Sequence, residues 1–227
     1  MRSAEAKTSS DPIGSGRRVL EPNERISEVL FGLIMVLTFT GSLSVADAGR
    51  GDVRAMLIGA LGCNFAWGII DAVFYLMGCL ADRGQSLTTL RAVRQAADSQ
   101  QAERLIAGAL PPLVTSVLGH AELATIRERL AKLPEPPKVA GLERRDAVGA
   151  LGVFLLVFLS TFPVAVPFLP LYHPANAVRW SNAVALVMLA VCGVAYGRAV
   201  GRSPWWSGAG MMILGALLVA LTIAFGG

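Results

Sequence analysis

Five long apolar stretches, separated by polar segments, dominate the pattern of the chain. Each is about 18 residues or longer, and together they contain a single charged side chain, Asp71. A helix of that length spans the roughly 30 Å hydrocarbon core of a bilayer, whereas strands of a membrane barrel would alternate over about ten residues. The pattern predicts an all-α integral membrane protein with five transmembrane helices. The predicted spans are residues 29–46, 55–81, 147–171, 180–197 and 206–227.

The polar segments complete the predicted organisation. Residues 1–27 carry charges of both signs and no apolar core, which predicts a disordered cytoplasmic tail, and residues 28–81 hold the first two spans. Residues 82–146 form a cytoplasmic helical insert, with a helix expected to begin at Ser86 as its N-cap. The insert is too short for an independent core, so we expect it to pack on the membrane domain or on a second copy. Residues 147–227 hold the last three spans.

Composition and charge support the membrane assignment and set an orientation. With 54% hydrophobic and 16% charged residues, the chain is too apolar for an ordinary soluble domain of 227 residues. Of the 20 Lys and Arg, five lie in the tail, ten in the insert and two in residues 198–205, so 17 share one side. The positive-inside rule then predicts a cytoplasmic N-terminus. The membrane that we expect the protein to span is the cell's inner (plasma) membrane. The isoelectric point of about 9.3 follows from this topology, so no nucleic-acid partner is expected.

Asp71 is the first candidate functional residue. In a helix it shares one face with Asn64, Gly68, Tyr75 and Gly78, so an amide, a carboxylate and a phenol line the same stripe. An ionised side chain at membrane depth costs about 2.5–3.5 kcal/mol on insertion scales, and such groups usually face a bundle interior or a wet cavity. Two interpretations follow. Asp71 handles an ion or a proton, or it accepts hydrogen bonds from a neighbouring helix and holds the bundle together.

The first span offers further candidate metal ligands. Glu28, Gly32 and Met35 share a helical face, with Thr38 adjacent, so an acid at the cytoplasmic end leads toward a thioether and a hydroxyl. Carboxylate and amide oxygens suit hard ions such as manganese, and a thioether adds affinity for softer metals. Asp71, Glu28 and Met35 are therefore the candidate metal ligands. Met35 can equally be a packing residue, and Glu28 can stabilise the N-terminus of its helix.

Prolines interrupt the third span. Pro163, Pro167 and Pro170 each remove a backbone donor, so we expect helix kinks at Pro163 and Pro167. Carbonyl oxygens freed in this way can line a cavity and bind cations. Ordinary helix termination explains Pro170 and Pro167 equally well, which makes Pro163 the more informative of the three.

Small residues at helical spacing favour close helix contacts. Gly193 and Gly197 form a GxxxG pattern, and Ala216, Ala220 and Ala224 repeat the same spacing. Such faces are candidates for the contact between two copies of the chain, because only a dimer would give a symmetric pathway to a protein with an odd number of spans.

An enzyme is the least favoured class of function. The chain has two histidines, His120 in the insert and His173 on the opposite side, and no nucleophile with a base, no phosphate-binding glycine loop and no zinc spacing. His120 and Glu122 are two positions apart and diverge on a helix, so we interpret them as part of a solvated face.

Three segments and the order of the spans point to a known family. FGLI at 31–34 opens the first span, FLSTFPVAVPF at 158–168 carries the prolines of the third, and RSPWWSGAGMMILGAL at 202–217 leads into the fifth. With two spans, a cytoplasmic helical insert and three further spans, this pattern resembles the vacuolar iron transporter family. The resemblance implies a homodimer whose first helices line a path for ferrous iron or manganese, moved out of the cytoplasm in exchange for protons.

One position departs from the family pattern. The family's first helix reads FGxxDG, whereas this chain has Met35 and Val36 at the last two positions. The carboxylate that serves the metal path in the family is therefore absent, and we expect Asp71, Asn64 and Glu28 to take its place.

Three functions follow as hypotheses. The leading one is a transporter that moves iron or manganese, with no bound cofactor, in a homodimer within the lipid bilayer. Its predicted path is lined by Asp71, Asn64, Glu28, Met35, Thr38 and Tyr75. The second is a non-transporting membrane scaffold or regulator of the same fold, whose basic insert contacts lipid or a partner. The third is a small-solute or proton-coupled carrier, which keeps Asp71 and needs no metal.

Overall fold

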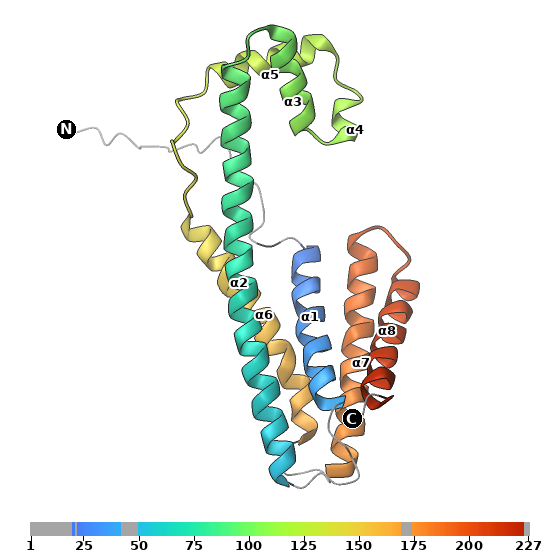
Figure 1. The fold of residues 1–227 in the computed structure, drawn as a ribbon. Helices are drawn as coiled ribbons and strands as arrows, with labels where there is room; N and C mark the ends of the chain where they lie inside the picture. Colours follow the sequence, from blue (N-terminus) through green and yellow to red (C-terminus); the bar gives the residue numbers. More distant parts are fainter. Residues whose placement is uncertain (1–19, 21, 42–49, 169–173, 225–227) are drawn as a thin grey trace, which may run out of the picture. The chain divides into compact units, whose positions relative to one another are not determined.

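The computed structural model describes residues 20, 22–41, 50–168 and 174–224. Every regular element in these ranges is a helix (Figure 1). In chain order the elements are α1 (Pro22–Gly41), α2 (Arg50–Arg94), α3 (Ser99–Ala109), α4 (Pro112–Thr115), α5 (His120–Ala131), α6 (Arg144–Ala165), the 3-10 helix η1 (Val166–Phe168), α7 (Pro174–Ala199) and α8 (Pro204–Ala224). The predicted all-α class is confirmed for this part of the chain.

Four helical stretches are long and apolar enough to cross a bilayer. They are Val53–Arg94, Arg144–Phe168, Asn176–Ala199 and Pro204–Leu221, and they match the second to fifth predicted spans. The first predicted span, 29–46, is described only as far as Gly41, within α1. Its last residues lie outside the described ranges, as do most of the predicted tail, Pro170 and His173. The structure thus supports a multi-pass membrane protein with four candidate spans.

Helix α2 differs from the sequence prediction at its C-terminal end. It continues without a break past residue 81 to Arg94, so Ser86 lies inside a helix and does not cap one. The Ser86 hydroxyl instead donates to the carbonyl oxygen of Asp82, one turn earlier, at 2.9 Å. The insert's first separate helix is α3, and its N-cap is Asp98, whose carboxylate accepts the N–H of Gln101 at 2.7 Å. The prediction of an N-cap at Ser86 is wrong because a serine inside a helix can satisfy its hydroxyl on the preceding turn.

The contacts divide the chain into two compact units, Met1–Asp71 with Leu151–Gly227, and Ala72–Ala150. We call them the first and second units. In the first unit, α1 packs against α7 and α8. One face of α1 is sealed in this core, where Leu33, Val36 and Leu37 are at most 1% exposed. They contact Ala60 of α2, Val164 of α6, and Ala185 and Leu189 of α7.

The GxxxG pattern of α7 packs against α8 of the same chain. A Cβ atom at Gly193 would lie 2.6 Å from the carbonyl oxygen of Ser207, and one at Gly197 would lie 2.7 Å from the hydroxyl of Ser207. Only glycine permits this approach, so α7 and α8 run side by side (Figure 1). The glycine face is therefore used within one chain, whereas Ala216, Ala220 and Ala224 are exposed.

The second unit has its own small core. Val93 at the end of α2 packs with Ala102 and Ile106 of α3 and with Leu123 of α5. Since Val93 of α2 is part of this core, the insert packs on an extension of the second membrane helix.

Three arginines on one face of α2 hold the segment that returns from α5 to α6. Arg94 donates to the carbonyl oxygens of Leu130 at 3.0 Å and Leu133 at 2.5 Å, at the C-terminal end of α5. Arg91 donates to those of Pro137 and Lys138, and Arg83 to that of Gly141 at 2.8 Å. Because positions i, i+8 and i+11 lie on one side of a helix, this single face fixes the path of a proline-rich segment that has few backbone donors of its own.

Candidate functional site

The inward face of α2 carries the predicted polar stripe. Asn64 is fully buried, Gly68 is buried, and Asp71 and Tyr75 are partly buried, whereas Gly78 is exposed. The helical spacing therefore identified the inward side correctly for its first four members. Tyr75 belongs to the second unit, and the other three belong to the first.

Asn64 joins three helices. Its Nδ2 group donates to the carbonyl oxygen of Gly32 on α1 at 3.2 Å and to the hydroxyl of Thr161 on α6. Its Oδ1 atom is buried and has no hydrogen-bond partner in the described part of the chain. The two donated hydrogen bonds hold the three helices together. The unsatisfied Oδ1 atom offsets part of this stabilisation, because a buried acceptor without a partner costs about 1–3 kcal/mol.

Gly32 is what allows α1 to approach α6 at this point. A Cβ atom there would overlap the hydroxyl of Ser160 and lie 2.6 Å from the carbonyl oxygen of Val157. Gly32 thus faces α6. Thr38 is exposed, and its hydroxyl donates to the carbonyl oxygen of Ile34 at 2.9 Å within its own helix. Gly32 is therefore buried, whereas Thr38, which was predicted to lie beside the same face, is exposed.

An aromatic side chain interrupts the stripe between Asn64 and Asp71. The ring of Phe154 on α6 fills the space beside Gly68, where an added Cβ would lie 2.9 Å from it. Phe154 stacks on Phe158, with ring centroids 5.8 Å apart, and meets Phe65 edge to face at 5.4 Å. In this conformation Asn64 and Asp71 are separated by an apolar wedge and do not form one continuous polar path.

Asp71 and Glu28 form the candidate ion site. The Asp71 Oδ2 atom is buried and has no hydrogen-bond partner among the described residues. Glu28 on α1 is partly buried, so desolvation is the main electrostatic cost of its charge, and Asp71 and Glu24 lie within electrostatic range of it. Two carboxylates brought within electrostatic range in a poorly hydrated place repel each other, and a cation or a shared proton relieves the repulsion.

Met35 and Thr38 are not brought into this pair by any contact that the structure shows. Met35 is partly buried and lies seven residues, or about 10 Å of helix rise, beyond Glu28. Among the described side chains no group of three or more His, Cys, Asp or Glu is placed to hold a metal ion. The set of Asp71, Glu28 and Met35 stays a prediction, and electrostatics support only its two acidic members.

Pro163 and Pro167 lie where α6 ends and passes into η1, and α6 continues through Pro163 without a break. Pro163 lies inside α6, and the chain passes into η1 three residues later, where Pro167 is buried. Pro167 has no N–H to offer the preceding turn. The hydroxyl of Ser181 on α7 donates to the carbonyl oxygen of Val164 at 2.8 Å. At least one carbonyl near the prolines is therefore satisfied by a neighbouring helix and does not line a cavity.

Tyr75 lies against the start of α6. Its ring and hydroxyl occupy the space in which a side chain at Gly149 would stand, and both residues belong to the second unit. The phenol therefore contributes to packing here, and its predicted place in a transport path stays untested.

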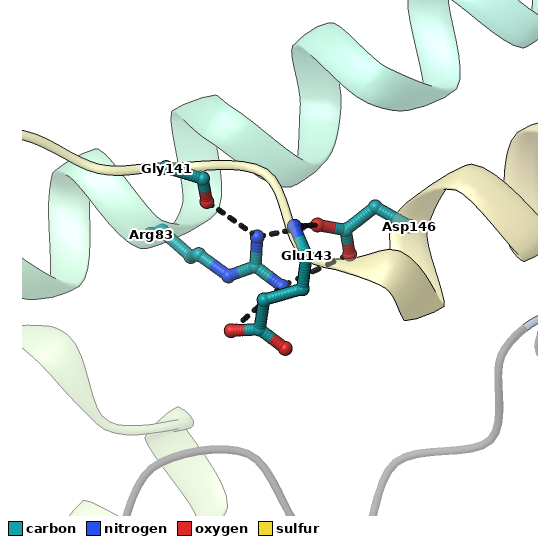
Figure 2. Close-up of polar contacts among 4 residues, drawn as sticks. All are labelled: Arg83, Gly141, Glu143 and Asp146. Carbon is teal, nitrogen blue, oxygen red and sulfur yellow. Dashed lines mark hydrogen bonds and ion pairs between the residues drawn. The ribbon is translucent and has the colours of Figure 1, made fainter.

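An ion pair that the sequence reasoning missed closes the second unit (Figure 2). Arg83 of α2 donates two hydrogen bonds to Asp146 in the first turn of α6, at 2.5 and 2.9 Å, and approaches Glu143 at 3.4 Å. Asp146 also accepts the backbone N–H of Glu143 at 2.7 Å. The hydrogen bonds from Arg83 lower the pKa of Asp146, despite its burial, and the N–H of Glu143 adds to this effect. We call this group, Arg83 with Asp146, Glu143 and Gly141, the arginine clasp.

The insert's acidic groups are used locally. Glu122 accepts the backbone N–H of Gly119 at 2.9 Å and so caps α5, while His120 pairs with Glu103 of α3 at 2.9 Å. His120 and Glu122 diverge, as the spacing predicted. A groove of about 640 Å³ near α3 and α5 is lined by Arg94, Asp98, Arg127 and Glu128 among others, and another hollow lies at Arg202; neither is lined by Glu28 or Asp71.

Comparisons with protein-family models and with curated proteins found no match for this chain.

Proposed function

We propose that the chain is a multi-pass transporter of the vacuolar iron transporter type, which moves a divalent metal ion, iron or manganese, out of the cytoplasm. The observation that supports it is the buried Oδ2 atom of Asp71, which has no hydrogen-bond partner among the described residues, with the partly buried Glu28 on α1 within electrostatic range. Two carboxylates neutralise a divalent cation, and hard ions of this kind take oxygen ligands. In this proposal Glu28 and Asp71 hold the ion, and Asn64 positions α1, α2 and α6 around it.

The proposed arrangement in the membrane follows the distribution of charge. We propose a fifth span at residues 29–46 and a location in the inner membrane. An N-terminus in the cytoplasm places 17 of the 20 basic residues on the cytoplasmic side. A homodimer is proposed through a face other than the α7 glycines, because these already pack against α8. The exposed Ala216, Ala220 and Ala224 offer one such face.

The same pair of carboxylates supports a second candidate, a proton-coupled carrier. Two acidic groups that repel each other can share one proton in place of a metal ion, as paired carboxylates do in other proteins. This candidate keeps Asp71 as the central residue and differs from the first in what relieves the repulsion.

One flux assay separates the candidates. Purified protein is reconstituted in liposomes that contain either a metal-sensitive or a pH-sensitive dye, and iron, manganese and proton entry are followed. Metal flux that is lost in both Asp71→Asn and Glu28→Gln supports the metal transporter, and proton flux without metal flux supports the carrier. Asp82→Asn, at an exposed position of the same helix, serves as the matched control.

Two results would contradict the proposal. Equal metal flux in the wild type and in Asp71→Asn would exclude the assigned site. The absence of metal and proton flux at every imposed gradient, from protein that is folded in the liposomes, would favour the scaffold or regulatory function.

A further inference from the structure

The turn between α7 and α8 exposes two tryptophans beside two arginines. The side chains of Trp205 and Trp206 are 80% and 81% exposed, and Arg198 and Arg202 are exposed as well. Tryptophan prefers the interface between a bilayer and water, where its ring is partly desolvated and its N–H stays hydrogen-bonded. The turn therefore has the composition of a segment that lies at the level of the lipid headgroups.

A glycine in the left-handed conformation shapes the backbone of this turn. Gly201 has a φ of 71°, a left-handed conformation that favours glycine, and the N–H of Arg202 donates to the carbonyl oxygen of Gly197 at 2.8 Å. The first intrahelical bond of α8 runs from the N–H of Ser207 to the carbonyl oxygen of Ser203 at 3.1 Å. Pro204, the first residue of α8, has no N–H. The N–H groups of Trp205 and Trp206 come before Ser207 in the first turn, so they have no carbonyl of the helix to bind and lie at its positive end.

A hollow of about 440 Å³ opens at the same place. It is lined by Arg202, Ser203, Trp206 and Ser207. These residues supply a guanidinium group and two hydroxyls next to an indole ring, which is a set of donors that matches a phosphate group with an apolar neighbour.

The stretch of sequence that carries these arginines contains no acidic residue. From Ala147 to Gly227 the sequence contains Arg179, Arg198 and Arg202 and no Asp or Glu. In a bilayer, anionic headgroups lie in the same plane as interfacial tryptophans and supply the missing negative charge. We infer that the hollow at Arg202 binds the phosphate-bearing headgroup of an anionic phospholipid, with the ring of Trp206 against its glycerol end.

This inference does not depend on transport. It concerns the turn between α7 and α8, whose hollow is lined by neither Asp71 nor Glu28, and it holds whether the protein moves a metal, moves a proton or acts as a scaffold. The flux assay and the lipid assay can therefore fail independently.

The test is a lipid titration of the full chain in detergent, followed by native mass spectrometry. Phosphatidylglycerol is compared with phosphatidylcholine of the same acyl chains. We expect the wild type to retain one phosphatidylglycerol at least about fivefold more tightly than phosphatidylcholine, and Arg202→Gln to lose about fivefold in affinity, since one basic residue near an anionic surface contributes a factor of this size. Arg179→Gln, at the other end of α7, is the matched control and should bind as the wild type does.

Three outcomes would overturn the inference. One is equal retention of phosphatidylglycerol by the wild type and Arg202→Gln, and another is an equal loss in Arg202→Gln and Arg179→Gln, which would show a general effect of net charge. The third is displacement of the lipid by millimolar inorganic phosphate, which would assign the hollow to a soluble anion. If Arg202→Gln lowers the thermal midpoint, Trp206→Leu replaces it, and the same loss of phosphatidylglycerol is expected.

Discussion

Arg83 and Asp146 form a two-point ion pair, with Nη1 2.5 Å from Oδ2 and Nη2 2.9 Å from Oδ1. The side chain of Asp146 is 7% exposed and that of Arg83 is 30% exposed, so the pair is shielded from water on the acidic side. The planar guanidinium fits a carboxylate in this way, and lysine would not reproduce both bonds. This pair fixes where α6 begins on α2, at the junction between the insert and the third predicted span.

Asp146→Asn should destabilise the second unit. The substitution removes the charge that accepts both bonds from Arg83, and we expect a loss of about 1.5–3 kcal/mol, the range for hydrogen bonds to charged groups. The thermal midpoint of the detergent-solubilised protein measures it. Glu143→Gln is the control, because that side chain is 61% exposed and 3.4 Å from Arg83, and it should change the midpoint little. Equal effects of the two substitutions would contradict the assigned geometry.

The same pair predicts a pH dependence. Arg83 lowers the pKa of Asp146 in the folded protein. The stabilising contribution of Asp146 is therefore fully present above the unfolded-state pKa of about 3.9 and is lost as the pH falls through the lower, folded-state pKa. The difference in midpoint between the wild type and Asp146→Asn should be constant at neutral pH and shrink below about pH 4. A difference that shrinks between about pH 5 and 7 would indicate that another group is responsible.

Gly32→Ala should separate α1 from α6. The added methyl group would lie 2.6 Å from the backbone oxygen of Val157, which cannot rotate away, so the helices must move apart. Overpacking of this kind costs about 1–3 kcal/mol. Gly62→Ala on α2 is the control because nothing lies within 4 Å of the new atom, and it should be neutral or slightly stabilising. Circular dichroism during heating compares the two variants.

Local periodicity predicted the helices and the inward face of α2, because both depend on the spacing of apolar residues along one element. The partners of each polar group depend on which helices meet, and this is set by tertiary packing. Serine is a preferred N-cap residue, but α2 continues through Ser86. Arg83, Arg91 and Arg94 share one face of α2, and this spacing was the available signal for the contact with the returning segment. The sequence does not show which carbonyls they bind.

The candidate site shows the same division. The spacing placed Asn64 and Asp71 on one stripe, and the structure places both on the inward side of α2. The wedge of Phe154 beside Gly68 comes from a residue about 86 positions later in the chain, so no local pattern indicates it. Likewise, a GxxxG pattern shows that a close helix contact is possible, and only the fold shows that its partner is α8 of the same chain.

Gly193→Ala tests the use of that glycine face. The new Cβ would lie 2.6 Å from the carbonyl oxygen of Ser207, so we expect the α7–α8 contact to loosen, with a loss of about 1–3 kcal/mol in stability. The oligomeric state, measured by size exclusion with light scattering, should not change. Gly210→Ala, where the added atom meets open space, is the control for stability. A change of oligomeric state without loss of stability would instead place Gly193 between two copies.

Asn64 and Asp71 should respond in opposite ways to the loss of their polar groups. Asn64→Leu removes the donor that joins Gly32 of α1 to Thr161 of α6, so the thermal midpoint should fall. The expected loss in the free energy of unfolding is about 1–2 kcal/mol, because two hydrogen bonds are lost but the unsatisfied Oδ1 atom is removed as well. Asp71→Asn removes a partly buried charge whose Oδ2 atom has no hydrogen-bond partner among the described residues, so the midpoint in the absence of metal should stay the same or rise. Added manganese should raise the midpoint of the wild type and of Asn64→Leu, because a ligand that binds only the folded state stabilises it, and should leave Asp71→Asn unchanged. If Asp71→Asn instead lowers the midpoint and keeps the response to manganese, the carboxylate holds the bundle together and the ion is bound elsewhere.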